Sequence, residues 1–139
     1  MPTVEYDHQF AYLHGEDGRQ FPGLLVNLHR LGEAEGGVDV DAYLDTGAEY
    51  SLFDGELARV VGLDLVSGED FAFNSTSGER LPAKRHGVVV EHSDLGQFEL
   101  VLAFSIGGIR RNLLGRDFLA RVQVGFRERQ SQFYATSAP

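Results

Sequence analysis

The sequence predicts a mostly β domain with one or two short helices. Apolar and polar residues alternate with the period of two that half-buried strands show, as in Val38–Leu44. The 17 glycines are dispersed between such runs, where they act as turn residues rather than as a linker. A chain of 15.3 kDa has room for one domain. We therefore expect a single domain over residues 10–135, with flexible termini at 1–9 and 136–139.

The elements follow in order from these patterns. Strands are predicted at residues 21–28, 38–44, 71–73, 88–90, 98–104, 122–126 and 133–134. Asp54–Gly62 has an aspartate that can cap a helix, a few apolar residues and a terminal glycine, so it predicts a short helix. A second short helix is expected after Gly115.

Composition excludes several classes of function. The formal net charge is −9, whereas proteins that bind nucleic acid rely on Lys and Arg to neutralise phosphates. No cysteine is present, and the five histidines show no metal-ligand spacing, so we expect no metal and no cofactor. No apolar run approaches the ~18 residues of a membrane span, and the first residues lack the pattern of a signal peptide. We expect a cytoplasmic protein with neither nucleic-acid nor membrane partners.

The segment Leu44–Phe53 carries the strongest chemical signal. A predicted strand ends directly in Asp45, Thr46 and Gly47, after which apolar residues resume. The strand thus delivers a carboxylate into a tight turn, where the hydroxyl can bond to neighbouring groups and the glycine allows close backbone approach. Taken alone, the tripeptide is equally typical of an ordinary β-turn with an aspartate at its corner.

A second motif decides between these interpretations. Asn112–Leu119 places two apolar residues and a glycine before Arg116, and Leu113 follows Asp45 by 68 residues. The two motifs, in this order and at this spacing, resemble those of the retropepsin-like aspartic proteases, the family of the retroviral enzymes and their cellular and bacterial relatives. The resemblance covers residues 21–134. It implies a retropepsin-like acid protease fold, a closed β-barrel-like half in which the two motif segments interlock beneath the active site.

The resemblance also implies roles for the segments between the motifs. Phe71–Leu81 matches the hairpin flap that closes over substrate, although its composition also suits any exposed hairpin. Glu49 and Arg116 match an acid and an arginine that pair in the family, with Arg116 supporting the floor of the site. Two solvated surface charges are the alternative. The substrate neighbours implied are Ala48, Glu49, Ser77 and Gly78.

A single Asp-Thr-Gly implies a homodimer. Aspartic proteases use two carboxylates and a water, and this chain has one such motif. The second carboxylate must then be Asp45 of another copy, related by a two-fold axis. Thr46 would brace the paired loops, and Gly47 would offer backbone contacts near a peptide or protein substrate. We expect the hairpin at residues 122–134 to form much of the dimer interface.

Two other functions match part of the sequence. The run Asp39–Asp41 is faintly similar to the nucleophile strand of haloacid-dehalogenase-type phosphatases, but the chain lacks the helices and length of their α/β sheet. The serious alternative is a retropepsin-fold dimeric binding or assembly module with weak or no proteolysis, because a fold does not guarantee an activity. The intact residues 45–48 favour the endopeptidase.

Overall fold

Strands dominate the computed structural model, which describes residues 1–74 and 77–137. The strands are β1 His8–Ala11, β2 Leu13–His14, β3 Gln20–Phe21, β4 Gly23–Arg30, β5 Val38–Leu44, β6 Leu52–Asp54, β7 Glu69–Asn74, β8 Arg80–His92, β9 Gly96–Ser105, β10 Leu113–Leu114, β11 Val122–Arg127 and β12 Gln132–Ser137. The helices are α1 Gly55–Val60 and α2 Arg116–Leu119, with 3-10 turns η1 Leu65–Ser67 and η2 Glu128–Gln130. The predicted mostly β class with two short α-helices is confirmed.

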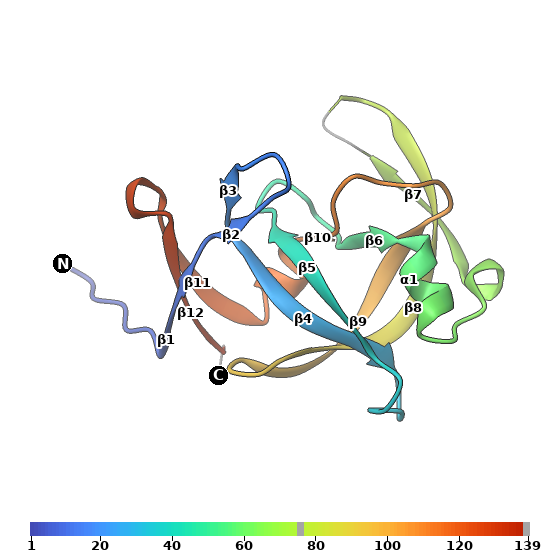
Figure 1. Cartoon of the computed structure of the whole chain (residues 1–139), viewed down its shortest axis with the longest axis horizontal. Coiled ribbons are helices and arrows are strands. Elements are labelled where there is room, and N and C mark those ends of the chain that lie inside the picture. The colour runs from blue at the N-terminus through green and yellow to red at the C-terminus, as the bar shows by residue number, and fades with distance from the viewer. Residues whose placement is uncertain (75–76, 138–139) are drawn as a thin grey trace.

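A closed barrel forms the body of the molecule (Figure 1). Its strands follow the order β4-β5-β10-β6-β9-β8, and β8 pairs back onto β4 to close the ring of six. Strand β7 pairs with the outer part of β8 and extends it as a hairpin. Because closure leaves one face of each strand inside, alternate residues such as Val26, Leu28, Val88 and Val90 fill the core.

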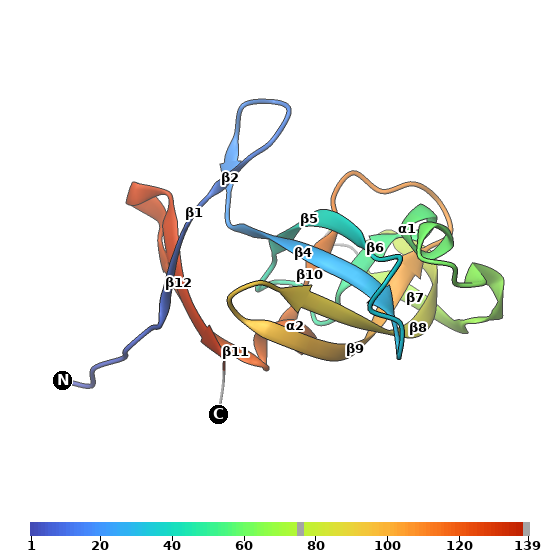
Figure 2. The same ribbon diagram turned by 60° about the horizontal axis from the view of Figure 1, so that its bottom comes forward.

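A three-stranded antiparallel sheet stands beside the barrel (Figure 2). Its order is β1-β12-β11, so the first strand of the chain pairs with the last. Phe133 on its inner face is fully buried and stacks on Phe10, with ring centroids 5.2 Å apart. Phe10 in turn meets the ring edge of His92 at the end of β8. These contacts fix the sheet against the barrel.

The short β2–β3 hairpin projects from one end of the barrel, beside the connection at 106–112 (Figures 1 and 2). The sequence predicts one strand over residues 21–28, but the structure divides it at Pro22, which has no N–H to donate to a ladder. Gly23 resumes the strand where a Cβ would lie 2.7 Å from the carbonyl oxygen of Ala42. The division turns β3 outward from β4.

Helix α1 begins and ends as its sequence predicts. The Asp54 carboxylate accepts a hydrogen bond of 2.9 Å from the backbone N–H of Glu56, which satisfies one free donor of the first turn. Gly62, with φ at +88°, follows the last turn in the left-handed conformation that glycine adopts without strain. No helix within residues 1–74 and 77–137 is long and apolar enough to cross a membrane.

Regular structure extends two residues beyond each predicted domain boundary. Strand β1 begins at His8 rather than at residue 10, and β12 runs to Ser137 rather than ending at residue 135. The cause is their pairing with each other, in the register His8 to Ala135. Of the predicted flexible C-terminus, residues 138–139 lie outside the described part of the chain.

Candidate active site

Strand β5 carries Asp45 to one end of the barrel. Ala42 and Leu44 are buried, so by alternation Asp41, Tyr43 and Asp45 lie on the opposite face of the strand. The N–H of Asp45 donates to the carbonyl of Leu114 at 2.9 Å, which continues the parallel pairing of β5 with β10. Leu114, in the second motif, therefore holds the backbone of Asp45 through a hydrogen bond.

The turn after β5 orients the Asp45 side chain. Its Oδ1 accepts a hydrogen bond of 2.8 Å from the N–H of Gly47, and the Asp45 carbonyl accepts from Ala48 at 3.3 Å. A Cβ at Gly47 would lie 3.2 Å from that same Oδ1, so glycine permits the close approach. Asp45 remains half-buried, which leaves its carboxylate within reach of a ligand.

The floor of this loop is made by the segment around Gly115. The N–H of Arg116 donates to the Ala48 carbonyl at 2.8 Å. A Cβ at Gly115 would lie 2.7 Å from the Ala48 oxygen and 2.8 Å from the Tyr50 oxygen, so no other residue fits without a backbone shift. The predicted interlock of the two motif segments is confirmed.

Ser51 and Asp117 brace the interlock, and the sequence interpretation missed both. The Ser51 hydroxyl donates to Asp117 Oδ1 at 2.7 Å and accepts from the Gly115 N–H at 3.0 Å. The Ser51 N–H donates to Asp117 Oδ2 at 3.1 Å. Ser51 is fully buried. The signal available was a lone serine before the apolar pair at 52–53, and an acid in the first turn after Gly115.

The expected salt bridge between Glu49 and Arg116 does not form. The ion pairs among the described residues are Asp17–Arg19, Arg30–Glu33, Glu56–Arg59 and Asp70–Lys84. Both Glu49 and Arg116 are exposed, because the bracing contact beneath the loop is made by Asp117, the residue after Arg116. The two charges instead line one hollow together.

This hollow, of about 380 Å³, lies between the Asp45 loop and strand β7. Gly47, Ala48, Glu49 and Arg116 all border it, so the structure brings four of the predicted site residues together. Its other walls are Tyr50 and residues 71–74 of β7. Tyr50 and Phe71 meet edge to face at 5.2 Å, which joins the loop to the base of the hairpin.

The hairpin predicted as a flap is present as β7 and β8, which pair from Glu69–Arg85 to Asn74–Arg80. Ser77 and Gly78 lie exposed at its tip, where Gly78 has φ +86°, and neither borders the hollow. Residues 75–76 of the predicted flap lie outside the described residues. The predicted hairpin is thus confirmed, and its action as a flap stays a prediction.

Thr46 lies at the outer surface of the loop. Its side chain is exposed and, within the described part of this single chain, makes no hydrogen bond. Residues 1–74 and 77–137 include no group of three side chains that could hold a metal ion. This chain therefore places the Asp45 carboxylate and the Thr46 hydroxyl at one end of the barrel, together with the hollow between the Asp45 loop and β7.

The barrel with its interlocked loops has a retropepsin-like fold. It is similar to the crystal structure of a retropepsin-like aspartic protease from Rickettsia conorii, at 20% identity over 98% of each chain and a TM-score of 0.63. It is also similar to EIAV protease complexed with the inhibitor HBY-793, at 16% identity over 73% of this chain and 86% of that chain, with a TM-score of 0.55. No protein-family model and no curated protein matches the sequence.

Proposed function

We propose that the protein is an aspartic endopeptidase, active as a homodimer with one site shared between two copies. The observation that carries this proposal is the position of Asp45, half-buried at the end of β5 in a loop locked to the Leu113–Arg116 segment. That arrangement occurs here in a retropepsin-like fold, and the solved structures of similar fold bear the name of proteases.

Two Asp45 carboxylates, one from each copy, would perform the reaction. Two carboxyl groups a few ångströms apart cannot both ionise readily, so they share a proton. The ionised carboxylate takes a proton from a water molecule, whose oxygen attacks the peptide carbonyl carbon. The protonated carboxyl donates a hydrogen bond to the carbonyl oxygen as it gains negative charge. Collapse of the tetrahedral intermediate breaks the C–N bond, and the leaving nitrogen takes up a proton.

The single chain offers what a two-fold partner would complete. The sequence has one Asp-Thr-Gly, and Thr46 directs an exposed hydroxyl with no partner among the described residues. In an isologous dimer the same surfaces meet each other, so Thr46 of one copy would face the loop of the second. The β1-β12-β11 sheet, with both outer edges unpaired within the described residues, is the proposed main interface.

Within this proposal, the hollow bordered by Ala48 and Glu49 takes substrate residues, and the β7–β8 hairpin closes over them with Ser77 and Gly78 at its tip. Arg116 supports the floor through its backbone N–H, which donates to Ala48. Gly47 keeps the loop open to the peptide backbone.

Digestion of a peptide library at acidic to neutral pH tests the activity. We expect Asp45→Asn to lower kcat/KM by about 10³-fold or more, because the dyad loses the group that deprotonates water. Asp64→Asn is the matched control, because Asp64 is an exposed aspartate just before η1 and its side chain makes no hydrogen bond. Equal turnover by the Asp45→Asn variant contradicts the assignment.

Sedimentation of the same preparations tests the dimer. A stable monomer that still cleaves peptides contradicts the shared site. A dimer that cleaves no library peptide, either as wild type or as Asp45→Asn, favours the alternative, a dimeric binding or assembly module.

A further inference from the structure

A second hollow, of about 490 Å³, lies on the same face of the barrel as the Asp45 carboxylate. Its floor is Asp41 and Tyr43 of β5, which share the outer face of the strand with Asp45. One wall is the β2–β3 hairpin, and the other is the connection at 106–112. Figure 1 shows both at the end of the barrel toward which the β7–β8 hairpin also points.

A stack of Phe21, Tyr43 and Arg111 lines this hollow. The Phe21 ring lies nearly parallel to the Tyr43 ring, with centroids 3.7 Å apart and an angle of 17°. The guanidinium carbon of Arg111 lies 4.5 Å from the Tyr43 centroid. Because Phe21 already covers one face of the tyrosine at stacking distance, Arg111 must cover the opposite face. Cation–π attraction therefore favours the position of the guanidinium over the ring.

The backbone beside Arg111 is fixed as well. The carbonyl of Asn112 accepts a hydrogen bond of 2.8 Å from the Tyr43 N–H, and Asn112 Oδ1 accepts one of 2.9 Å from the N–H of Asp54. A guanidinium that is stacked by its face still has its N–H groups free around its edge. Arg111 is thus a cation oriented in advance, and no salt bridge among the described residues uses it.

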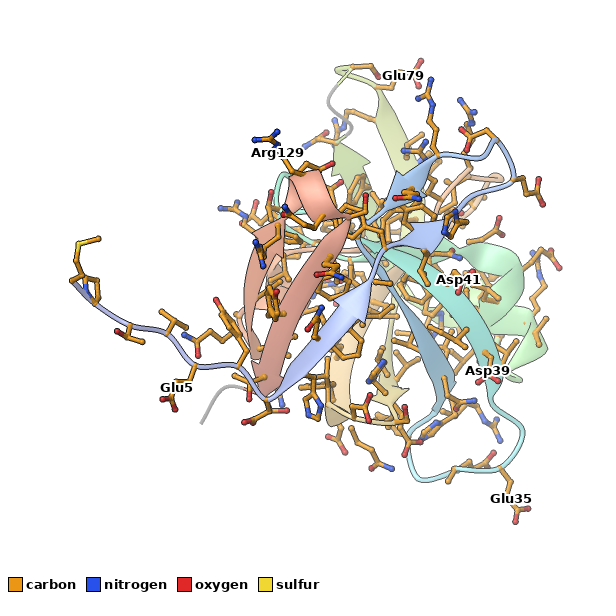
Figure 3. The ribbon with its side chains drawn as sticks, turned by 60° about the vertical axis from the view of Figure 1, so that its left-hand side comes forward. Glu5, Glu35, Asp39, Asp41, Glu79 and Arg129 are labelled. Carbon is orange, nitrogen blue, oxygen red and sulfur yellow. The ribbon has the colours of Figure 1, made fainter. Side chains whose placement is uncertain are left out.

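Three acids, Glu16, Asp17 and Asp41, and two cations, Arg110 and Arg111, line the hollow. Tyr43, with Arg111 above it, lies two residues from Asp45, about 7 Å along the strand. Asp41 lies twice as far from Asp45, beside Asp39 on the strand (Figure 3). The acid Asp17, at the rim, is already paired with Arg19. A substrate chain that runs from Asp45 along β5 therefore reaches the stacked Arg111 before it reaches Asp41.

We propose that this hollow is the subsite that selects an acidic side chain of the substrate, with Arg111 as the specificity-determining residue. The proposal rests on the endopeptidase function proposed above. A substrate glutamate or aspartate would receive paired N–H groups from the guanidinium fork, the geometry in which Arg binds carboxylates best. Since the chain carries a net charge of −9, long-range repulsion opposes an acidic substrate, and selection must come from this local cation.

The test compares kcat/KM for matched peptides that carry Glu, Gln or Lys in turn at each position near the cleaved bond. At one position the wild-type dimer is expected to favour Glu by about tenfold, the worth of a hydrogen bond to a charged group. Arg111→Glu should reverse the preference toward Lys. Arg111→Lys should retain only part of it, because an ammonium cannot present the stacked fork.

Arg59→Glu is the matched control. It makes the same change in net charge at an exposed residue of α1, which borders neither hollow and lies outside the proposed dimer interface, and should keep the preference for Glu. Cleavage that shows no preference for Glu, or a preference that Arg111→Glu leaves unchanged, overturns the subsite and leaves the protease proposal standing. Absence of cleavage by the wild type overturns both.

Discussion

The floor beneath Asp45 is joined mainly by backbone groups, whereas the three-stranded sheet is joined to the barrel by side chains. At the floor, Gly115 and Arg116 donate N–H groups to Ser51 and Ala48, at 3.0 and 2.8 Å. At the sheet, Phe10 packs on His92, and the Ser137 hydroxyl donates to the Leu95 carbonyl at 2.6 Å.

The sheet junction also holds two groups, Tyr12 and His92, whose pKa is shifted by the fold. Burial, together with a hydrogen bond of 2.7 Å to Glu128, raises the pKa of Tyr12 to about 12, and this residue packs against Phe133 of the sheet. Burial lowers the pKa of His92, opposed by the nearby charge of Asp94 and assisted by that of His8. Both residues belong to the sheet junction. Ionisation of Tyr12 in alkali and protonation of His92 in acid therefore both act on the sheet junction.

Gly115→Ala is expected to give the largest effect, because it breaks the floor. The added Cβ would lie 2.7 Å from a backbone oxygen, which cannot move without shifting the Asp45 loop. The free energy of unfolding, from urea titration, should fall by about 3 kcal/mol or more. Gly107→Ala is the control, since nothing lies within 4 Å of a Cβ there. Equal free energies of unfolding for the two variants would show that the floor can accommodate a Cβ at Gly115.

Ser51→Ala should have the next largest effect. It leaves the Gly115 N–H without its partner inside the fold and removes one of the two hydrogen bonds to Asp117 Oδ1. We expect a loss of about 2 kcal/mol in the free energy of unfolding, the cost of buried groups that lose a hydrogen bond. Ser93→Ala, at an exposed serine, should change it by less than ~0.5 kcal/mol. A loss of stability in Ser93→Ala without one in Ser51→Ala would contradict the bracing role of Ser51.

Strand alternation and end signals were enough to predict much of this fold. Val38–Leu44 is the strand predicted, and the helix capped by Asp54 begins at the next residue. What sequence could not supply was the partner of each charge. Glu49 and Arg116 were paired through the resemblance, whereas the structure pairs Ser51 with Asp117, 66 residues apart. Neighbours of this kind depend on how β5 and β10 register, which no local pattern records.

The hollow beside Tyr43 could likewise not be predicted from the sequence. Phe21, Tyr43 and Arg111 come from three separate segments, and they meet only because β3 turns outward at Pro22. By contrast, Ala48 and Glu49 follow Asp45 directly, so their place beside the hollow at β7 follows from adjacency alone.

The smallest expected effect is the loss of stability in acid that follows from protonation of His92 at the sheet junction. Its Nδ1 accepts from the N–H groups of Asp94 and Leu95, at 3.1 and 3.3 Å. Because its pKa is lowered in the folded state, the unfolded chain binds more protons below the ordinary value of 6.5. Stability is therefore complete above pH 6.5 and falls as the pH drops below it.

Urea titrations at pH 7.5, 6.5 and 5.5 measure this effect. His92→Asn keeps an acceptor for the same turn but does not titrate. The wild type should lose more stability than His92→Asn between pH 6.5 and 5.5, and the two should run parallel above pH 6.5. Curves that stay parallel over the whole range would remove His92 as the source of acid sensitivity.

The pairing of β1 with β12 also sets the order in which the molecule can be completed. Asp7 accepts a hydrogen bond from the Thr136 hydroxyl, 129 positions later. All strands of the barrel precede β11, so the barrel can close while the chain is still being synthesised. The sheet must wait for residues 132–137, the part of the domain that is made last. If the proposed dimer forms through that sheet, a nascent chain cannot pair its Asp45 with that of another copy, and the proposed proteolysis is withheld until translation has passed residue 137.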